Sequence, residues 1–215
     1  MIARQITARG VRDARVLEAL RAVPRELFVP EAYRDMAYDD CALPIGEGQT
    51  ISQPFVVAAM TAALGIDEGA RVLEVGTGSG YQAAVLAGLG ARVFTIEILE
   101  PLAERAAATL DMLGYTDVQI RIGDGYTGWP EAAPFDAILI AAATDHVPDP
   151  LVEQLAVGGR LVVPLGPKAE QELVRIRKTS SELLREPLFP VRFVPMTGNA
   201  ESDPSTRRKF GFFRE

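Results

Sequence analysis

The clearest chemical pattern in the sequence is a glycine-rich turn within Val72-Leu73-Glu74-Val75-Gly76-Thr77-Gly78-Ser79-Gly80. Glycines directly after an apolar strand allow a tight turn and let the backbone approach a ligand at the start of the next helix. Dinucleotide sites favour GxGxxG, in which a pyrophosphate lies at the helix N-terminus. Here the third glycine comes one residue earlier and position 81 is tyrosine. Taken alone, the turn is as consistent with tight packing as with ligand binding, and its spacing disfavours a dinucleotide.

Two acidic residues fall where strands are expected to end. Glu97 lies 21 residues after Gly76 (97 − 76), and Asp124 lies within Gly123-Asp124-Gly125 after the following strand. Glu97 is placed to accept hydrogen bonds from both hydroxyls of a ribose, and Asp124 from an adenine amino group. Taken singly, each is more readily a loop-end carboxylate that faces water. Because both follow consecutive strands beside the glycine turn, we expect a cofactor site there.

Few side chains are available for nucleophilic or metal-dependent chemistry. The sequence has one cysteine (Cys41), one histidine (His146) and one tryptophan (Trp129). A single cysteine excludes an internal disulfide and cysteine-based zinc or iron–sulfur sites, and a single histidine excludes HExxH metalloproteases, so no metal site is predicted. We interpret Cys41 as a small packed residue, His146 as a solvated loop residue rather than a catalytic one, and Trp129 as packing a loop against the sheet.

The charge balance of the chain is acidic. With 22 basic and 29 acidic residues the formal net charge is −7, which argues against a protein that binds a nucleic-acid backbone. The one dense basic run, 207–209, is interpreted as a solvated tail. The N-terminal residues do not resemble a secretory signal, and no apolar run approaches the roughly 18 residues of a membrane span. We expect a cytoplasmic protein.

The elements that must position the turn and the acids alternate regularly after residue 70. Apolar runs predict strands over residues 71–75, 92–97, 118–122, 135–141 and 160–165. Helical spacing and capping residues predict helices over residues 16–23, 55–64 (opened by Pro54), 81–87, 101–113 and from 149 to the glycines at 158 and 159. This alternation indicates βαβ units and a parallel sheet. Val174 and Ile176 alternate with arginines, and Val191 and Phe193 flank Arg192, which predicts antiparallel strands at the sheet edge.

We therefore predict a single domain of the open, doubly wound α/β class with a mostly parallel sheet. The 215 residues suffice for one large core and are too few for two ordinary domains. Residues 1–66 form an N-terminal helical and loop-rich cap over the cleft, 67–166 the cofactor-binding core, 167–197 the antiparallel edge strands and 198–215 a flexible extension. Phe210, Phe212 and Phe213 of the extension are candidates for docking on the domain or on a neighbour. The oligomeric state stays open.

The ExGxGxG pattern resembles the Rossmann-like cofactor loop of class I S-adenosylmethionine (SAM) methyltransferases, whose ligand lacks phosphate and needs only close backbone approach to its methionine part. Further segments resemble one family in that class, protein-L-isoaspartate O-methyltransferase. They are Gly48-Gln49-Thr50-Ile51-Ser52-Gln53-Pro54, Gly76-Thr77-Gly78-Ser79-Gly80-Tyr81-Gln82, Gly123-Asp124-Gly125-Tyr126, Val23-Pro24-Arg25, Phe28-Val29-Pro30, Gly158-Gly159-Arg160-Leu161-Val162 and Phe193-Val194-Pro195-Met196. The resemblance runs in order from about residue 10 to residue 197, and the Gln-Thr-Ile-Ser-Gln-Pro stretch is its most specific part.

That family methylates the α-carboxylate of L-isoaspartyl residues, and of some D-aspartyl residues, in damaged proteins and peptides. The ester then collapses to a succinimide, whose hydrolysis returns part of the material to normal aspartate. The resemblance implies SAM as the cofactor and Ser52 as the active-site serine. It implies that Thr50 and Ile51 lie beside the cofactor, and Gln53, Pro54 and Ala142 beside the substrate. The other implied cofactor-binding residues are Gly76, Gly78, Ser79, Gly80, Glu97, Asp124, Gly125 and Thr197.

The scarcity of histidine and cysteine suits this reaction. A carboxylate with a pKa of roughly 3.5–4 is already ionised at neutral pH and needs no general base. SAM carries an activated methyl group, so the protein has to align three atoms and exclude water. A serine hydroxyl can hydrogen-bond one carboxylate oxygen and leave the other to attack. Because Ser52 precedes Pro54 and a helix, an N-cap role worth about 1 kcal/mol is the alternative, and the two roles are compatible.

Other functions stay open at this point. A SAM methyltransferase for nucleic acid or a small molecule has little support, since the sequence contains neither an Asn-Pro-Pro-Tyr nor a Pro-Cys motif. A catechol-type enzyme with carboxylate-bound Mg²⁺ has no motif in its favour. A nicotinamide oxidoreductase is disfavoured by the glycine spacing, and a catalytically silent SAM-binding module follows if Ser52 is only a cap.

Overall fold

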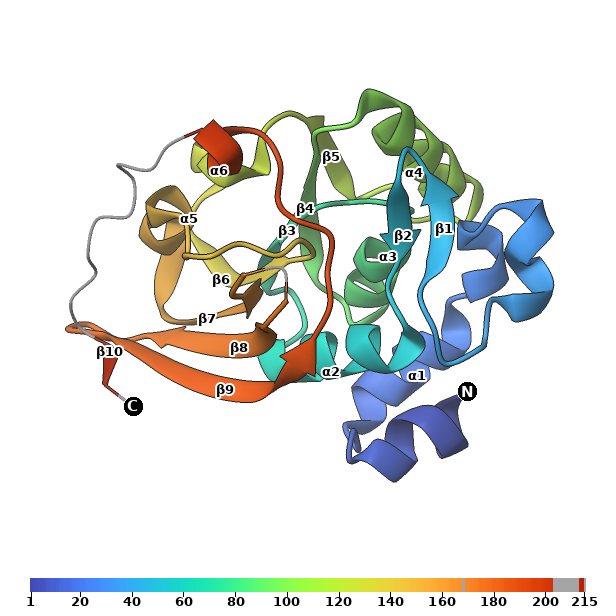
Figure 1. The fold of residues 1–215 in the computed structure, drawn as a ribbon, viewed down its shortest axis with the longest axis horizontal. Coiled ribbons are helices and arrows are strands. Elements are labelled where there is room, and N and C mark those ends of the chain that lie inside the picture. The colour runs from blue at the N-terminus through green and yellow to red at the C-terminus, as the bar shows by residue number, and fades with distance from the viewer. Residues whose placement is uncertain (168, 203–212, 215) are drawn as a thin grey trace.

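A twisted eight-stranded sheet in the order β10-β9-β8-β7-β6-β3-β4-β5 runs through the centre of the protein (Figure 1). The computed structural model describes residues 1–167, 169–202 and 213–214. The strands of the sheet are β3 (Arg71–Val75), β4 (Arg92–Glu97), β5 (Gln119–Ile122), β6 (Phe135–Ile140), β7 (Leu155–Leu165), β8 (Gln171–Lys178), β9 (Leu183–Val191) and β10 (Phe213–Arg214). The five strands from β7 to β5 are parallel, whereas β8 is antiparallel to both β7 and β9, and β10 is parallel to β9. The predicted α/β class and the antiparallel edge are confirmed.

Helices cover both faces of this sheet. Those on one face are α1 (Ala14–Ala22), α2 (Pro54–Leu64), α3 (Tyr81–Gly88) and α4 (Glu100–Met112). The other face carries α5 (Asp149–Gln154) and the loop segments around Trp129, and the last described helix is α6 (Asn199–Ser202). Among the helices of the described residues, none combines the length and apolar character that crossing a bilayer requires.

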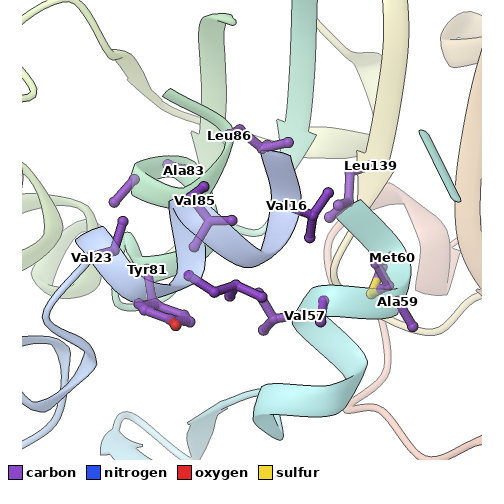
Figure 2. Close-up of a cluster of buried hydrophobic side chains, with 14 of the residues drawn as sticks. Val16, Val23, Val57, Ala59, Met60, Tyr81, Ala83, Val85, Leu86 and Leu139 are labelled. Atoms are coloured by element: carbon purple, nitrogen blue, oxygen red, sulfur yellow. The ribbon is translucent and has the colours of Figure 1, made fainter. Parts of the chain in front are cut away.

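The sheet divides the core into two clusters, because successive side chains of each strand point to opposite faces. In β3, Val72 packs with α1, α2 and α3, whereas Leu73 packs with α5 on the opposite face. Figure 2 shows the first of these clusters, in which Val16 of α1, Val57 of α2 and Tyr81 of α3 lie close together. These contacts attach the N-terminal segment to the sheet. Trp129 meets the Phe94 ring of β4 edge-on with centroids 5.5 Å apart, so its predicted packing against the sheet is confirmed.

The sheet order reverses beside β3, and this point fixes where a ligand can bind. From β3 the chain continues through β4 and β5 on one side, and β6 then pairs with the other side of β3. At such a switch point the carboxyl ends of two adjacent strands diverge and leave a crevice. Here that crevice lies between the glycine turn after β3 and Ala141 after β6.

One predicted helix is shorter in the structure. The sequence places its end at the glycines 158 and 159, but α5 ends at Gln154 and β7 begins at Leu155. Leu155 pairs with Phe135, and the register then shifts between Phe135 and Ala137. A Cβ on Gly159 would lie 2.9 Å from the backbone oxygens of Ala156 and Asp136. These glycines therefore serve an irregularity inside the strand rather than a helix terminus.

Two further elements differ from the prediction. The stretch predicted as loops before α2 contains a hairpin, β1 (Leu43–Gly46) and β2 (Gln49–Ile51), which turns through left-handed Gly46, Glu47 and Gly48. The strand β9 ends at Val191, so Phe193 follows it rather than forming part of it.

The predicted C-terminal extension, residues 198–215, is described only in part. Asn199 begins α6, and Phe213–Arg214 pair with Leu183–Leu184 of β9 as the short strand β10. Phe210 and Phe212 lie outside the described residues, as does the basic run 207–209.

Candidate active site

Two clefts meet at Ser52 on the carboxyl edge of the sheet. We call the first cleft the hollow lined by residues 49–52, 74–79, 81–82, 96–99, 141–142 and 194–197 together with Val57, Met60, Gly125 and Leu139, with about 950 Å³ of empty space that is partly open to solvent. The second cleft, with about 1050 Å³ of empty space that is partly open to solvent, is lined by residues 40–42, 52–53, 55–56 and 189–194 together with Arg9, Thr50 and Ala141. The two clefts share Thr50, Ser52, Ala141 and Val194.

The glycine turn gives the first cleft its floor. Gly76 and Gly78 adopt φ of 93° and 54°, a left-handed conformation that side-chain-bearing residues rarely take. A Cβ on Gly76 would lie 3.5 Å from the Cβ of Ala141, so the bare backbone also keeps the two diverging strands close. Gly80 has φ of 86° but lies away from the cleft, where a Cβ would crowd Leu110 and Ala106 of α4. Its conformation therefore serves helix packing.

Glu97 at the end of β4 is tied to this turn. One carboxylate oxygen accepts a hydrogen bond from the backbone N–H of Gly78 at 2.8 Å, and the other accepts from the N–H of Leu99 at 3.1 Å. The side chain is 6% exposed and lines the first cleft. Each carboxylate oxygen keeps a second lone pair for a ligand hydroxyl.

Glu74 is a second acid in the first cleft and is fully buried. Its Oε2 accepts a hydrogen bond from Thr95 Oγ1 at 2.7 Å, while its Oε1 is buried without a partner among the described residues. Burial, together with the nearby charge of Glu97, raises the pKa of Glu74 to about 8. This carboxyl therefore has an unused acceptor in the wall of the cleft, which a ligand carrying a positive charge or a donor would satisfy.

The charges of the two clefts differ in sign. Among the described residues that line the first cleft, Glu97 carries a negative charge, Glu74 is largely protonated at neutral pH because its pKa is raised to about 8, and no lysine or arginine is present. The second cleft contains two arginines, Arg9 and Arg192, against one acid, Asp40. The first cleft therefore favours a cationic ligand and the second an anionic one.

The second cleft combines its cations with an apolar wall. The guanidinium of Arg9 lies 3.4 Å from the centroid of the Phe55 ring and 3.4 Å from a carboxylate oxygen of Asp40. Phe55 in turn contacts Phe189 of β9, with ring centroids 5.3 Å apart. This arrangement holds the guanidinium at the cleft wall. Cys41, interpreted from the sequence as a small packed residue, lies partly buried at this wall.

Ser52 does not act as a helix cap here. The N-cap of α2 is Gln53, and no side chain caps this helix. Within the described residues, the Ser52 hydroxyl has no hydrogen-bond partner, and it lies at the junction of the two clefts. The cap alternative therefore loses its geometric basis, and the hydroxyl stays available for a ligand.

The remaining predicted residues divide between the clefts. Those in the first cleft are Ile51, Ser79, Gly125 and Thr197, and Thr50 lines both clefts. Ala142, expected beside the substrate, lines the first cleft and not the second. Gln53 lines the second cleft, where its side chain donates to the carbonyl of Asp40 at 2.8 Å. Pro54 starts α2 and lines neither cleft. The predicted residues thus surround the junction at Ser52, apart from Pro54, Gly80 and Asp124.

Asp124 lies beside the first cleft and contacts the C-terminal segment. Its Oδ1 accepts from the N–H of Tyr126 at 2.9 Å, and its Oδ2 accepts from the N–H of Asn199 at 2.7 Å. The bond to Asn199 holds the segment that directly follows Thr197, which lines the cleft. Asp124 therefore connects the loop after β5 with the segment that closes this end of the site.

His146 lies outside both clefts. Its Nε2 is 2.9 Å from the hydroxyl of Tyr126, and its Nδ1 is 2.8 Å from a carboxylate oxygen of Asp145. A search of the described part of the chain finds no group of three or more His, Cys, Asp or Glu side chains that could hold a metal ion.

Several residues at the site were not predicted from the sequence. Glu74 and Tyr81 belong to the glycine motif but have no assigned role there, and both line the first cleft. Arg25 belongs to the Val23-Pro24-Arg25 motif and donates a hydrogen bond to the carbonyl of Ser52. Arg9 and Arg192 carry no sequence signal, because the folded chain alone brings these distant segments together.

A cationic methyl donor fits the first cleft, where two acids and a bare glycine turn meet at the switch point of the sheet. Fold and site together place the chain among the class I SAM-dependent methyltransferases. Comparisons with known proteins narrow this class. Residues 1–201 match the family model described as Protein-L-isoaspartate(D-aspartate) O-methyltransferase (PCMT).

Relatives of known name agree with this match. The chain is 54% identical over 198 residues to a protein-L-isoaspartate O-methyltransferase of Gloeobacter violaceus, covering 92% of this chain and 97% of that protein. It is 57% identical over 201 residues to protein-L-isoaspartate O-methyltransferase 1 of Rhodopseudomonas palustris, covering 93% and 82%. The chain belongs to the protein-L-isoaspartate(D-aspartate) O-methyltransferase family, which uses SAM as its methyl donor.

Solved structures support the same fold. One protein-L-isoaspartate O-methyltransferase superposes with a TM-score of 0.84 at 33% identity, covering 90% of this chain and 64%, less than two thirds, of that chain. A second, from Plasmodium falciparum and in complex with S-adenosyl-L-homocysteine (SAH), superposes with a TM-score of 0.77 at 25% identity, covering 89% and 94%.

Proposed function

We propose that the chain transfers the methyl group of SAM to the α-carboxylate of L-isoaspartyl residues, and of some D-aspartyl residues, in damaged proteins and peptides. In this proposal the first cleft binds SAM, the second admits the damaged segment, and Ser52 orients the carboxylate. The resulting methyl ester collapses to a succinimide, which initiates repair.

The observation that carries the assignment of roles is the meeting of two oppositely charged clefts at an unpartnered serine hydroxyl. The charge of Glu97 and the unpartnered oxygen of Glu74 favour the cationic SAM, and Arg9 and Arg192 favour a carboxylate. Because Thr50, Ser52, Ala141 and Val194 line both clefts, a methyl donor in one and an acceptor in the other would meet beside Ser52.

The residues of this site then have positioning roles. When bound, SAM supplies an activated methyl group whose transfer forms an oxygen–carbon bond and leaves the electron pair of the broken bond on sulfur. The Ser52 hydroxyl donates a hydrogen bond to one oxygen of the substrate carboxylate and directs the other toward the methyl carbon. No proton has to move, so the site needs no base. Alignment of this kind can contribute about 7–11 kcal/mol.

The cofactor residues hold the other reactant in place. We propose that Glu97 binds the ribose hydroxyls, Asp124 the adenine amino group, and the backbone of Gly76, Gly78 and Gly125 approaches the ligand closely. Thr50, Ile51, Ser79, Ala142 and Thr197 complete the walls of the first cleft. Gln53 lies on the substrate side.

The same proposal divides the chain by role and assigns a compartment. Residues 1–66 supply Arg9, Asp40 and Ser52 and act as a cap over a core of residues 67–166, with the edge strands 167–197 closing the second cleft. The partners are isoaspartyl proteins and peptides rather than nucleic acid, which the net charge of −7 disfavours. We propose a cytoplasmic location, which a single cysteine suits.

The proposal is tested with radiolabelled SAM and two peptides that differ only in one isoaspartyl or aspartyl linkage. We expect base-labile methyl ester on the isoaspartyl peptide alone. Labelling of both peptides, or of neither, would show that the substrate has been assigned wrongly. A base-stable product would place the methyl group on an atom other than a carboxylate oxygen.

A further inference from the structure

The guanidinium of Arg25 is buried without an acidic partner behind the active-site segment. Arg25 lies in the short helical segment Arg25–Phe28 and its side chain is 0% exposed. None of the acidic side chains in the described residues forms an ion pair with it. An unneutralised buried charge is costly, and desolvation lowers the pKa of this guanidinium below its usual value.

The hydrogen bonds of Arg25 connect the active-site segment at Ser52 to the N-terminal segment at Ala37. Its Nη2 donates to the carbonyl oxygen of Ser52 at 2.7 Å, and its Nε donates to the carbonyl oxygen of Ala37 at 2.7 Å. Its central carbon lies 4.8 Å from the ring centroid of Tyr81, which lines the first cleft. The third nitrogen, Nη1, is buried without a hydrogen-bond partner in the described structure.

We propose that Arg25 is a positioning residue for methyl transfer, which fixes the peptide unit of Ser52 and makes its surroundings favourable for an anionic carboxylate. The inference rests on the proposed role of Ser52. A neutral side chain of similar volume would fill the same space without the desolvation cost of a buried charge. Retaining the guanidinium therefore fits a role in which both its fixed donor geometry and its charge are used.

The charge of Arg25 is expected to affect substrate binding, whereas its hydrogen bond to Ser52 is expected to affect kcat. Methyl transfer from a sulfonium to a carboxylate removes both charges, so a nearby cation favours the bound carboxylate more than the partly neutralised transition state. The charge therefore contributes to binding of the substrate. The hydrogen bond to Ser52 holds the hydroxyl in line with the reacting atoms and therefore contributes to kcat.

Equilibrium binding to the SAH-loaded enzyme separates the charge from general structural effects. The two probes are an isoaspartyl peptide and its neutral analogue, in which the α-carboxylate is replaced by a carboxamide. Calorimetry gives the ratio of their dissociation constants for the wild type and for R25Q, R25K and R160Q. Arg160 is the matched control because its guanidinium donates to the carbonyls of Leu64 and Gly65, at 2.9 and 2.7 Å, away from both clefts.

We expect the wild type to bind the carboxylate peptide more tightly, and R25Q to reduce this preference by about tenfold, while R25K and R160Q retain it. Steady-state kinetics should then show a lower kcat for R25K than for R160Q, because an ammonium cannot make both carbonyl hydrogen bonds in the same geometry. Binding of SAH and the melting temperature, measured on each variant, confirm that the compared proteins are folded.

The outcomes distinguish this inference from the proposed function. If the wild type does not prefer the carboxylate peptide, the assignment of the second cleft to isoaspartyl substrates is wrong. If the wild type prefers it and R25Q keeps the full preference, the inference about Arg25 is wrong and the proposed function stands. Should R25Q not fold, a kcat of R25K equal to that of R160Q would overturn the inference, since the altered hydrogen-bond geometry would then have no effect on catalysis.

Discussion

The carboxylate of Glu97 accepts a hydrogen bond from the backbone N–H of Gly78 at 2.8 Å. This bond joins the end of β4 to the glycine turn that follows β3, and the second oxygen of Glu97 accepts from the N–H of Leu99 at 3.1 Å. The acid expected to bind the cofactor ribose therefore also holds the turn that approaches the rest of the cofactor. The two motifs, separated by 21 residues in the sequence, act as one unit in the fold.

Replacing Glu97 with alanine should weaken SAH binding by about 10- to 100-fold, because charged acceptors for two ribose hydroxyls are lost and the turn is loosened. Isothermal titration calorimetry measures the change. E100Q is the control, since Glu100 lies exposed in the first turn of α4. Equal affinity of E97A and wild type for SAH would exclude Glu97 from the cofactor site.

S52A should lower kcat by about tenfold or more while the affinity for SAH stays within about threefold. Because no side chain caps α2, the substitution should leave the free energy of unfolding nearly unchanged. D13A is the matched control. Asp13 caps α1 by accepting from the N–H groups of Arg15 and Val16, so its loss should cost about 1 kcal/mol of stability and leave kcat unchanged. An S52A variant with full turnover would disprove the proposed role of this serine.

D124A should remove the ability of the enzyme to distinguish adenine from hypoxanthine. Its carboxylate already accepts from the N–H groups of Tyr126 and Asn199, and in the proposed function its remaining lone pairs would accept from the adenine amino group. We expect wild type to bind SAH about tenfold more tightly than S-inosylhomocysteine, which presents a carbonyl instead, and D124A to bind the two alike. If D124A keeps the preference, another group recognises the base.

The glycine turn and Glu97 could be expected to meet at one edge of the sheet because their sequence signals are local. The glycine turn follows its strand directly, and Glu97 ends the next strand, so their position at one sheet edge follows from parallel topology alone. The hairpin before α2 was missed because its strands are short and contain Pro44, which weakens any strand pattern.

Other features could not be predicted because they depend on segments that only the fold brings together. Arg9, Asp40 and Arg192 form the charged part of the second cleft from three separate regions of the chain. The pairing of Leu155 with Phe135 likewise overrides the local helix pattern, since a strand position in the sheet offers burial that a longer α5 would lose. Long-range contacts therefore determine the boundary between α5 and β7 and the charges of the second cleft, which local sequence patterns leave ambiguous.

Glu74 should make stability depend on pH. Its pKa is raised to about 8 from an ordinary 4.5, so the folded protein keeps a proton that the unfolded chain releases between these values. The stabilising contribution is thus fully present below the unfolded pKa and is lost as the pH rises through about 8. We expect the free energy of unfolding to fall by up to about 1.4 kcal/mol per pH unit in this window, and E74Q, which stays neutral, to lack this component. Urea titrations of wild type and E74Q at a series of pH values measure this difference. If their free energies of unfolding depend on pH in the same way, the raised pKa of Glu74 is wrong.

Gly125 should be sensitive to the addition of a single methyl group. A Cβ at this position would overlap Cγ1 of Val75, which ends β3 beside the cofactor turn. G125A should therefore destabilise the protein by about 1–3 kcal/mol and weaken SAH binding, since both residues line the first cleft. G123A is the control, because a Cβ on Gly123 meets no atom within 4 Å.

The double variant V75A/G125A should be less destabilised than the sum of the single variants, because removing the valine methyl groups makes room for the new one. Strictly additive free energies in this cycle would show that the two sites do not touch as described.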